Sequence, residues 1–201
     1  MTSFDAAELG RRLDALEFPR ALAFTAACAQ RRRAVGVRIL EAHARSEDAA
    51  AYDLALEQLW STARAQSAAT DAAADAWARF DALPEFEAEE ESSGELAYSE
   101  DAIITLGYAT RFARGQGAAN AVYCASRSYD AAGFLDKQTT AAAAAHQDSA
   151  LGEAEVRSQQ EDLADLADDE PLTEVVSRIR TRAEAEGERV AAAAPHPGAS
   201  A

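Results

Sequence analysis

The chain has 201 residues, of which 19 are basic and 35 are acidic, and its formal net charge of −16 argues against a nucleic acid or an anionic membrane surface as a partner. About a quarter of the residues are alanine, the strongest helix former, whereas the 10 glycines and 5 prolines are too few for the many turns of a β-sandwich or barrel. The acidic charge either only keeps the protein soluble or also attracts a basic protein partner.

The two cysteines and the amino terminus indicate the compartment. Cys28 and Cys124 each lie among small apolar residues in helical patterns, so we expect buried free thiols in a reducing environment. The chain begins Met-Thr-Ser-Phe-Asp, without the basic and apolar regions of a signal peptide. It also lacks an apolar run of about 18 residues, the length that a membrane-spanning helix needs. We therefore expect a cytoplasmic protein.

The first two predicted helices cover residues 5–17 and 20–33. Leucines recur at helical spacing in the first helix, and Ser3 is a candidate N-cap. Pro19 opens the second helix at a position where a missing N–H costs no hydrogen bond. This helix is apolar on nearly all sides, which is typical of a central helix. Three consecutive arginines, residues 31–33, end it, and we expect them to form a solvated helix end where cations offset the helix dipole.

Three more helices are predicted before the middle of the chain. A short one covers residues 37–44, and Ser46, followed by two acidic residues, begins the next. Thr70 begins the third, which ends before Pro84. We expect the large apolar side chains of these segments to be core rather than binding residues. The predicted core includes Phe24, Tyr52, Leu56, Leu59, Trp60, Trp77 and Phe80.

An acidic segment between residues 85 and 101 interrupts the helical pattern. Residues 92–94, Ser-Ser-Gly, lie in its middle and favour an exposed loop. Two interpretations remain open: a solvated spacer, or a docking loop for a basic protein. Asp101 directly precedes an apolar run and is predicted to be a carboxylate at a helix N-terminus. The candidate partner-binding residues are Glu85, Glu87, Glu89, Glu90 and Glu91.

The second half of the chain is predicted to be helical again. A helix over residues 103–114 ends at the glycine pair of residues 115–117, and another helix follows. The alanine run of residues 141–145 is either helical or part of a mobile connection. A more polar helix comes next, and Pro171 opens the last one, for which Gly187 is a candidate C-cap.

The pattern as a whole predicts an all-α fold. We expect a single-domain bundle of about seven to nine helices in residues 1–190. The tail, residues 191–201, consists of small residues and two prolines and is predicted to be disordered.

The sequence contains no recognisable metal, cofactor or catalytic motif. No two of its three histidines are four residues apart, and no Cys-x-x-Cys pair occurs. The acidic segment lacks the alternating ligands and central glycine of a helix–loop–helix calcium site. Neither a phosphate-binding glycine loop nor a Gly-x-Ser-x-Gly elbow is present. We therefore expect no cofactor and no metal, and we favour a protein that is not an enzyme.

The order of several short motifs resembles the YjaG-like family, a bacterial domain-of-unknown-function family of about this length. The matching segments are residues 12–17, 22–31, 56–60, 101–106, 159–161, 179–180 and 186–187. The sequence departs from the family at Gln30, where the family has glutamate, and at Val156 and Gln160, where it has an aromatic pair. Its ending after Gly187 also differs. The resemblance implies an all-helical fold and a bacterial cytoplasmic protein, and it implies no catalytic residues.

Two functional hypotheses follow from these observations. The first is a non-enzymatic protein that binds another macromolecule. One version of it is a toxin-neutralising immunity protein, whose acidity would complement a basic nuclease toxin. The second is an enzyme or small-ligand-binding protein with a site between helices. Thr25, Thr105 and Ser126, polar residues inside apolar stretches, favour the second, unless their hydroxyls bond to carbonyls of their own helix.

Overall fold

The computed structural model describes residues 4–66, 69–88, 92–141 and 150–194, with the side chains of residues 138–141 left aside. These residues form eight α-helices and one short 3₁₀-helix without a strand, so the predicted all-α single-domain bundle of seven to nine helices is confirmed. The α-helices are α1 (Ala6–Asp14), α2 (Phe18–Ala42), α3 (Ser46–Ala65), α4 (Asp71–Asp81), α5 (Leu96–Ala113), α6 (Ala119–Ala141), α7 (Ala150–Ala167) and α8 (Leu172–Ala193), and the 3₁₀-helix η1 is Pro84–Phe86.

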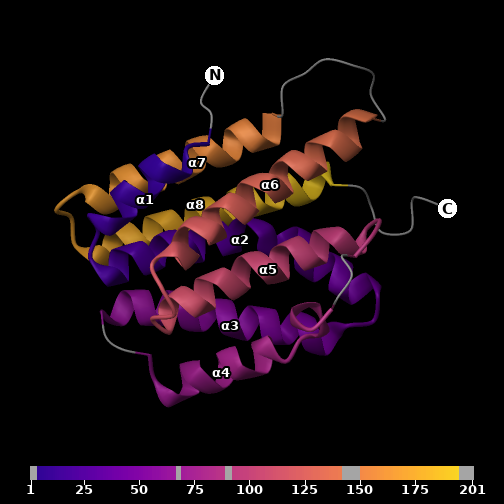
Figure 1. Cartoon of the computed structure of the whole chain (residues 1–201), viewed down its shortest axis with the longest axis horizontal. Helices are drawn as coiled ribbons and strands as arrows, with labels where there is room; N and C mark the ends of the chain where they lie inside the picture. The colour runs from indigo at the N-terminus through magenta and orange to yellow at the C-terminus, as the bar shows by residue number, and fades with distance from the viewer. Residues whose placement is uncertain (1–3, 67–68, 89–91, 142–149, 195–201) are drawn as a thin grey trace.

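Helix α2 is the central element of the bundle. It packs against α3, α5, α6, α7 and α8, which surround it (Figure 1). The apolar run of residues 21–29 explains this position, because every residue in it is buried. Small side chains predominate in the run, so neighbouring helices approach α2 closely. The prediction of a central second helix that begins near Pro19 is confirmed.

Helix α2 is also longer than predicted. The expected break after residue 33 does not occur, and one helix of 25 residues includes most of the predicted segment 37–44 and ends at Ala42. No proline interrupts this stretch, and Gly36 fits because α5 comes very close to it. A β-carbon built on Gly36 would lie 2.5 Å from the β-carbon of Ala102. The close helix–helix contact, rather than a turn, therefore explains why this position in the helix is a glycine.

Several predicted boundaries are confirmed and others are wrong. Thr70 caps α4 through its side chain, and α3 begins at Ser46. The N-cap of α1 is Asp5, whose carboxylate accepts two backbone N–H groups, whereas Ser3 lies outside the described residues. Gly187 is not a C-cap but an interior residue of α8. A β-carbon there would lie 3.1 Å from a carbonyl oxygen of α2, so this glycine too permits a close helix contact.

The ends of the predicted loops also differ from the structure. Helix α5 begins at Leu96, so the acidic segment is shorter than residues 85–101 and Asp101 lies beyond the first helical turn. Asp101 is thus not the N-terminal carboxylate that was predicted. Helix α8 continues to Ala193, through the first residues of the predicted tail, and residues 195–201 lie outside the described part of the chain. The alanine run of residues 141–145 falls almost entirely outside it as well.

The predicted core residues are confirmed as core. Phe24, Trp60 and Trp77 have no exposed surface, and neither have Tyr52 and Phe80. The indole N–H of Trp77 donates to the Ala55 carbonyl at 3.2 Å, so its burial leaves no unpaired donor. Among the described residues, no helix has an apolar stretch long enough to cross a membrane.

The Gly36 contact gives a prediction about stability. Gly36→Ala should lower the free energy of unfolding, because displacing α5 costs about 1–3 kcal/mol, more than the roughly 1 kcal/mol gained in helix propensity. Urea denaturation would measure the change. Gly10→Ala is the matched control, since its new β-carbon would make an ordinary 3.7 Å contact with Val122. That variant should gain stability, and an equal gain in both variants would contradict the close contact.

Candidate functional site

Two of the three consecutive arginines are buried inside the bundle. Arg31 is 1% exposed and Arg32 is 5% exposed, while Arg33 is half-buried. The prediction of a solvated helix end is therefore wrong for this triplet. The helix does not end there, and α7 and α8 cover it with carboxylates. A buried guanidinium is tolerated only where charged partners replace the water that it loses.

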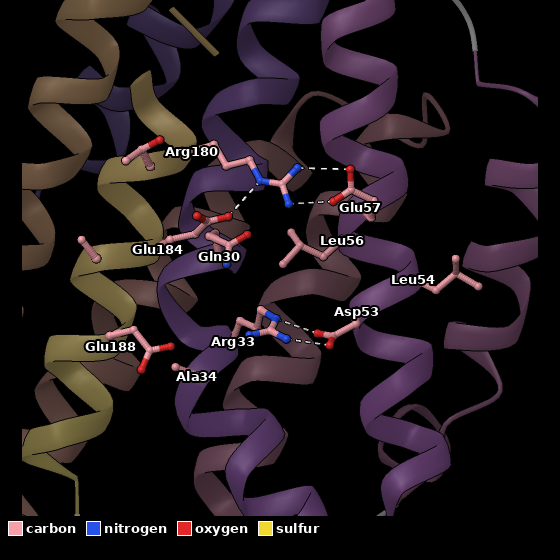
Figure 2. Close-up of a pocket in the computed structure, with 12 residues that line it drawn as sticks. Gln30, Arg33, Ala34, Asp53, Leu54, Leu56, Glu57, Arg180, Glu184 and Glu188 are labelled. Carbon is pink, nitrogen blue, oxygen red and sulfur yellow. Dashed lines mark hydrogen bonds and ion pairs between the residues drawn. The ribbon is translucent and has the colours of Figure 1, made fainter. Parts of the chain in front are cut away.

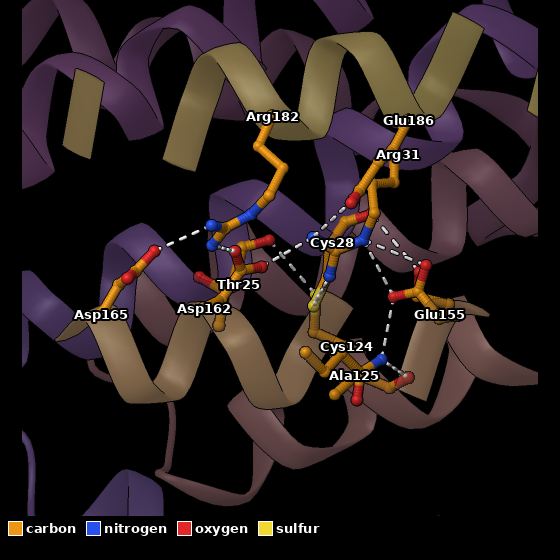
Figure 3. A network of polar contacts seen from close by, with 12 residues as sticks. Thr25, Cys28, Arg31, Cys124, Ala125, Glu155, Asp162, Asp165, Arg182 and Glu186 are labelled. Carbon is orange, nitrogen blue, oxygen red and sulfur yellow. Dashed lines mark hydrogen bonds and ion pairs between the residues drawn. The ribbon is translucent and has the colours of Figure 1, made fainter. Parts of the chain in front are cut away.

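Arg31 is held by two carboxylates of α7 (Figure 3). Its Nε donates to both oxygens of Glu155, at 3.1 and 3.0 Å, and its Nη1 donates to Asp162 at 2.7 Å. The third nitrogen, Nη2, lies 3.4 Å from the sulfur of Cys28. Glu155 and Asp162 are seven residues apart and lie on one face of α7, so a single arginine bridges two turns of that helix.

Each of these carboxylates also binds a second arginine. Arg32 donates to Glu155 at 2.9 Å, and Arg182 of α8 donates to Asp162 at 2.5 Å. Gln159 donates to Glu155 at 2.9 Å and to the Ala125 carbonyl of α6 at 3.1 Å. The result, which we call the buried charge cluster, joins α2, α7 and α8 and reaches α6. It consists of Arg31, Arg32, Glu155, Gln159, Asp162 and Arg182.

The positive charges of this cluster keep Glu155 ionised. Burial alone would raise the pKa of Glu155, but the positive charges of Arg31 and Arg32 outweigh it and lower the pKa to about 2. Burial raises the pKa of the Cys28 thiol, which is therefore not an activated nucleophile. Cys28 and Cys124 are both buried and free, as predicted. The cluster thus provides fixed charges rather than a reactive thiol.

A cavity of about 460 Å³ lies beside the cluster, and we call it the arginine pocket. Helices α2, α7 and α8 form its walls. Arg157 stands exposed at its edge and makes no ion pair among the described residues. Its lining has five arginines and three glutamates: Arg31, Arg32, Arg157, Arg182, Arg189, Glu155, Glu161 and Glu186.

A larger, half-open hollow of about 900 Å³ lies between α2, α3 and α8, and we call it the charged groove (Figure 2). Its acidic and basic lining residues are Arg33, Asp53, Glu57, Arg180, Glu184 and Glu188. Four carboxylates therefore face two guanidinium groups. This balance is opposite to that of the arginine pocket, although α8 contributes a wall to both hollows.

Both arginines of the groove are already paired. Arg33 makes a bidentate ion pair with Asp53, with hydrogen bonds of 2.7 and 2.6 Å. Arg180 makes another with Glu57, at 3.1 and 2.7 Å, and its Nε donates to Glu184 at 2.9 Å (Figure 2). Glu188, by contrast, is exposed and makes no ion pair among the residues that the structure describes. Glu57 is also bound by Arg64 at 3.1 Å, so the surplus of negative charge in the groove lies on Glu184 and Glu188.

Of the predicted partner-binding residues, the two that the structure describes, Glu85 and Glu87, line neither hollow. Glu85 accepts from Arg45 at 2.5 and 3.0 Å, which ties η1 to the start of α3. Glu87 is exposed, and residues 89–91 lie outside the described chain. Partner binding by this segment stays a prediction. Glu85 is the least suited of the candidate residues, because Arg45 already compensates its charge.

Asp101 and two of the three polar residues named within apolar stretches, Thr25 and Thr105, have structural partners. Asp101 pairs with Arg127 at 2.7 Å, and burial raises the pKa of its carboxyl to about 6 despite that partner. The hydroxyl of Thr25 donates to the Leu22 carbonyl at 2.9 Å, and that of Thr105 donates to the Asp101 carbonyl at 2.7 Å. These hydroxyls satisfy their own helices, so they do not mark a ligand site between helices.

The charged residues of α8 were not predicted as site residues from the sequence, although their spacing along the helix indicates that they line polar surfaces. Arg180, Glu184 and Glu188 recur every four residues and face the groove. A second polar stripe, residues 182, 186 and 189, faces the arginine pocket. The apolar stripe of α8 packs into the core between them. A helix with two polar stripes and one apolar stripe indicates two separate polar surroundings.

The described residues contain no group of three or more histidine, cysteine, aspartate or glutamate side chains placed to hold a metal ion. No protein-family profile matches the chain, and no curated protein matches it. Among solved structures, the chain is similar to the crystal structure of a DUF416 family protein from Shewanella baltica OS155. The two are 19% identical, with a TM-score of 0.64, over 91% of this chain and 94% of that one. This likeness shows a fold shared with a bacterial family of unknown function, and it does not single out the YjaG-like family.

Removing the central arginine should strongly destabilise the protein. Arg31→Met leaves Glu155 and Asp162 short of a partner in the interior, which should cost about 3–5 kcal/mol in the free energy of unfolding. Arg11→Met is the control, because Arg11 is 75% exposed and pairs only with Glu8. It should change stability by less than about 0.5 kcal/mol. Similar losses in the two variants, measured by urea denaturation, would refute the importance of the cluster.

The lowered pKa of Glu155 predicts a pH dependence of stability. Unfolded, this carboxyl titrates near its ordinary value of 4.5, and folded it titrates near 2, so the unfolded chain binds the extra proton between these values. The contribution of Glu155 is complete above pH 4.5 and is lost as the pH falls toward 2. From about pH 6 to about pH 3 the parent should lose roughly 2 kcal/mol more than Glu155→Gln. Parallel profiles for the two proteins would contradict this assignment.

Proposed function

We propose that the chain is a non-enzymatic protein that binds a basic segment of another protein in the charged groove. The observation that carries this proposal is the charge balance of the groove, four carboxylates against two arginines that are already paired. An incoming lysine or arginine gains from the surplus, whereas an incoming carboxylate is repelled. The net charge of −16 extends the same preference over longer distances and would speed the encounter.

Two glutamates of α8 are best placed to contact such a segment. Glu184 and Glu188 are both exposed and lie one turn apart on the wall of the groove (Figure 2). Glu184 uses one oxygen to hold Arg180, which leaves the other for a partner. The paired arginines orient the carboxylates around them, so the acceptors are fixed in advance and binding orders few side chains.

Beneath these side chains, contacts with the core hold the floor of the groove in place. Gln30 accepts a hydrogen bond from the indole N–H of Trp60 at 3.1 Å, and the guanidinium of Arg180 lies 5.9 Å from the centre of the same indole. Trp60 has no exposed surface and anchors this arrangement in the core. A groove with a fixed floor and charged walls suits recognition of an extended or helical segment with spaced basic residues.

The sequence resemblance supports two finer proposals. We infer that the chain belongs to the YjaG-like family and acts in the bacterial cytoplasm. A toxin-neutralising immunity protein is one form of the proposed function, because a basic nuclease toxin has the charge that the groove favours. The competing hypothesis, a small-ligand-binding protein or enzyme with a site between helices, draws specific support only from the arginine pocket.

A labelled peptide of alternating arginine and glycine would test the groove. Fluorescence anisotropy should show that it binds, and that a glutamate–glycine peptide of equal length does not. Replacing Glu184 and Glu188 together by glutamine should weaken binding about 5–10-fold at low salt, since each exposed charge contributes roughly 0.5–1 kcal/mol. The difference should shrink as the ionic strength rises.

A charge-matched variant separates the groove from the general acidity of the protein. Asp168→Asn with Glu174→Gln removes the same two charges from exposed positions outside the groove. This control should bind the arginine–glycine peptide as the parent does. Equal weakening of peptide binding in both double variants would show that net charge alone attracts the peptide, which would contradict the proposal. An absence of binding by the parent would contradict it too.

A further inference from the structure

The arginine pocket has more guanidinium donors than the protein itself uses. Arg157 makes neither an ion pair nor a hydrogen bond among the described residues. Arg189 is 74% exposed, and its closest carboxylate oxygen, on Glu186, is 3.9 Å away. The side chain of Arg32 is only 6% exposed, yet its Nε has no hydrogen-bond partner. In a chain with almost twice as many acidic as basic residues, this concentration of underused arginines is unexpected.

The buried charge cluster does not account for these donors. Glu155 is shared by Arg31, Arg32 and Gln159, and Asp162 is shared by Arg31 and Arg182. Both acids are thus fully committed within the interior. They neutralise the innermost arginines. The guanidinium groups of Arg157 and Arg189, at the edge of the pocket, are therefore available to pair with an anion from outside the protein.

One acceptor in the same pocket also lacks a hydrogen-bond partner. The buried Oε2 of Glu186 has none, and the nearest guanidinium nitrogen, on Arg31, is 3.8 Å away. Burial raises the pKa of this carboxyl above its ordinary value. An occupant that pairs with Arg157, Arg189 and the buried oxygen of Glu186 must therefore present acceptors to the arginines and a hydroxyl donor to Glu186, whereas Glu161, also in the lining, is exposed to water.

We propose that the arginine pocket binds the phosphate or carboxylate group of a small hydroxylated molecule. Guanidinium groups pair with such oxyanions through two parallel hydrogen bonds, and Arg157 and Arg189 reach the cavity from two different helices, α7 and α8. The cavity volume of about 460 Å³ is within the range of small-ligand sites. The site lies on a different face of α8 from the charged groove, so it stands independently of the proposed binding of a basic segment.

Isothermal titration calorimetry with three probes tests the pocket. Inorganic phosphate should bind to the parent, and glycerol 3-phosphate should bind more tightly because its hydroxyls reach Glu186. Glycolate is the carboxylate counterpart, and its affinity relative to glycerol 3-phosphate identifies which oxyanion the pocket prefers. If none of the three binds at concentrations up to about 10 mM, where even a weak site would be occupied, the proposal is wrong.

Variants at the edge of the pocket leave the buried cluster intact. Arg157→Gln with Arg189→Gln should weaken the preferred anion by at least about 10-fold, since two charge-assisted contacts are lost. Arg11→Gln with Arg79→Gln removes the same charge from exposed positions elsewhere and should bind like the parent. Unchanged affinity in the pocket variant, or equal losses in both variants, would overturn the assignment. Circular dichroism should show both variants folded.

Discussion

The position of Arg31 constrains the rest of the bundle more than any other single contact. A guanidinium that is 1% exposed has to find its partners in the protein, and Glu155 and Asp162 supply them from another helix. Such a cluster is a weak source of net stability, because desolvation offsets most of the attraction. Its effect is on geometry: sliding α7 along α2 by one turn would leave charges unpaired in the interior. Apolar contacts alone would tolerate that shift more easily.

Helix α8 lines two hollows of opposite charge balance. Its apolar stripe, which includes Ile179 and Ala183, packs against the core, while the polar stripes on either side face different hollows. Gly187 brings the helix against the α2 backbone, so both hollows share a wall that has little freedom to move. The same helix can therefore hold carboxylates for a cation on one face and guanidinium groups for an anion on the other without the two sets neutralising each other.

The sequence predicted what depends on neighbours along the chain. Trp60 and Trp77 were expected in the core because helical spacing places them on apolar stripes, and the structure confirms this. Arg31 and Arg32 were misassigned because their partners lie more than 120 residues away, beyond any local pattern. Gly187 was interpreted as a helix end, whereas it marks a close helix contact, like that of Gly36, which becomes visible only in three dimensions. The hollows depend on such pairings and could not be located beforehand.

The separation of Arg31 from its partners has a consequence for synthesis on the ribosome. Glu155 follows Arg31 by 124 residues and Asp162 follows it by 131, so α2 is made long before the acids that neutralise it. Until α7 and α8 are made, the face of α2 that carries Arg31 lacks the helices that cover it, so the guanidinium stays hydrated while α2 packs against α3 and α5. The last quarter of the chain therefore determines when this face of α2 is closed. We expect the Arg31 side of α2 to stay open to water until α7 leaves the exit tunnel.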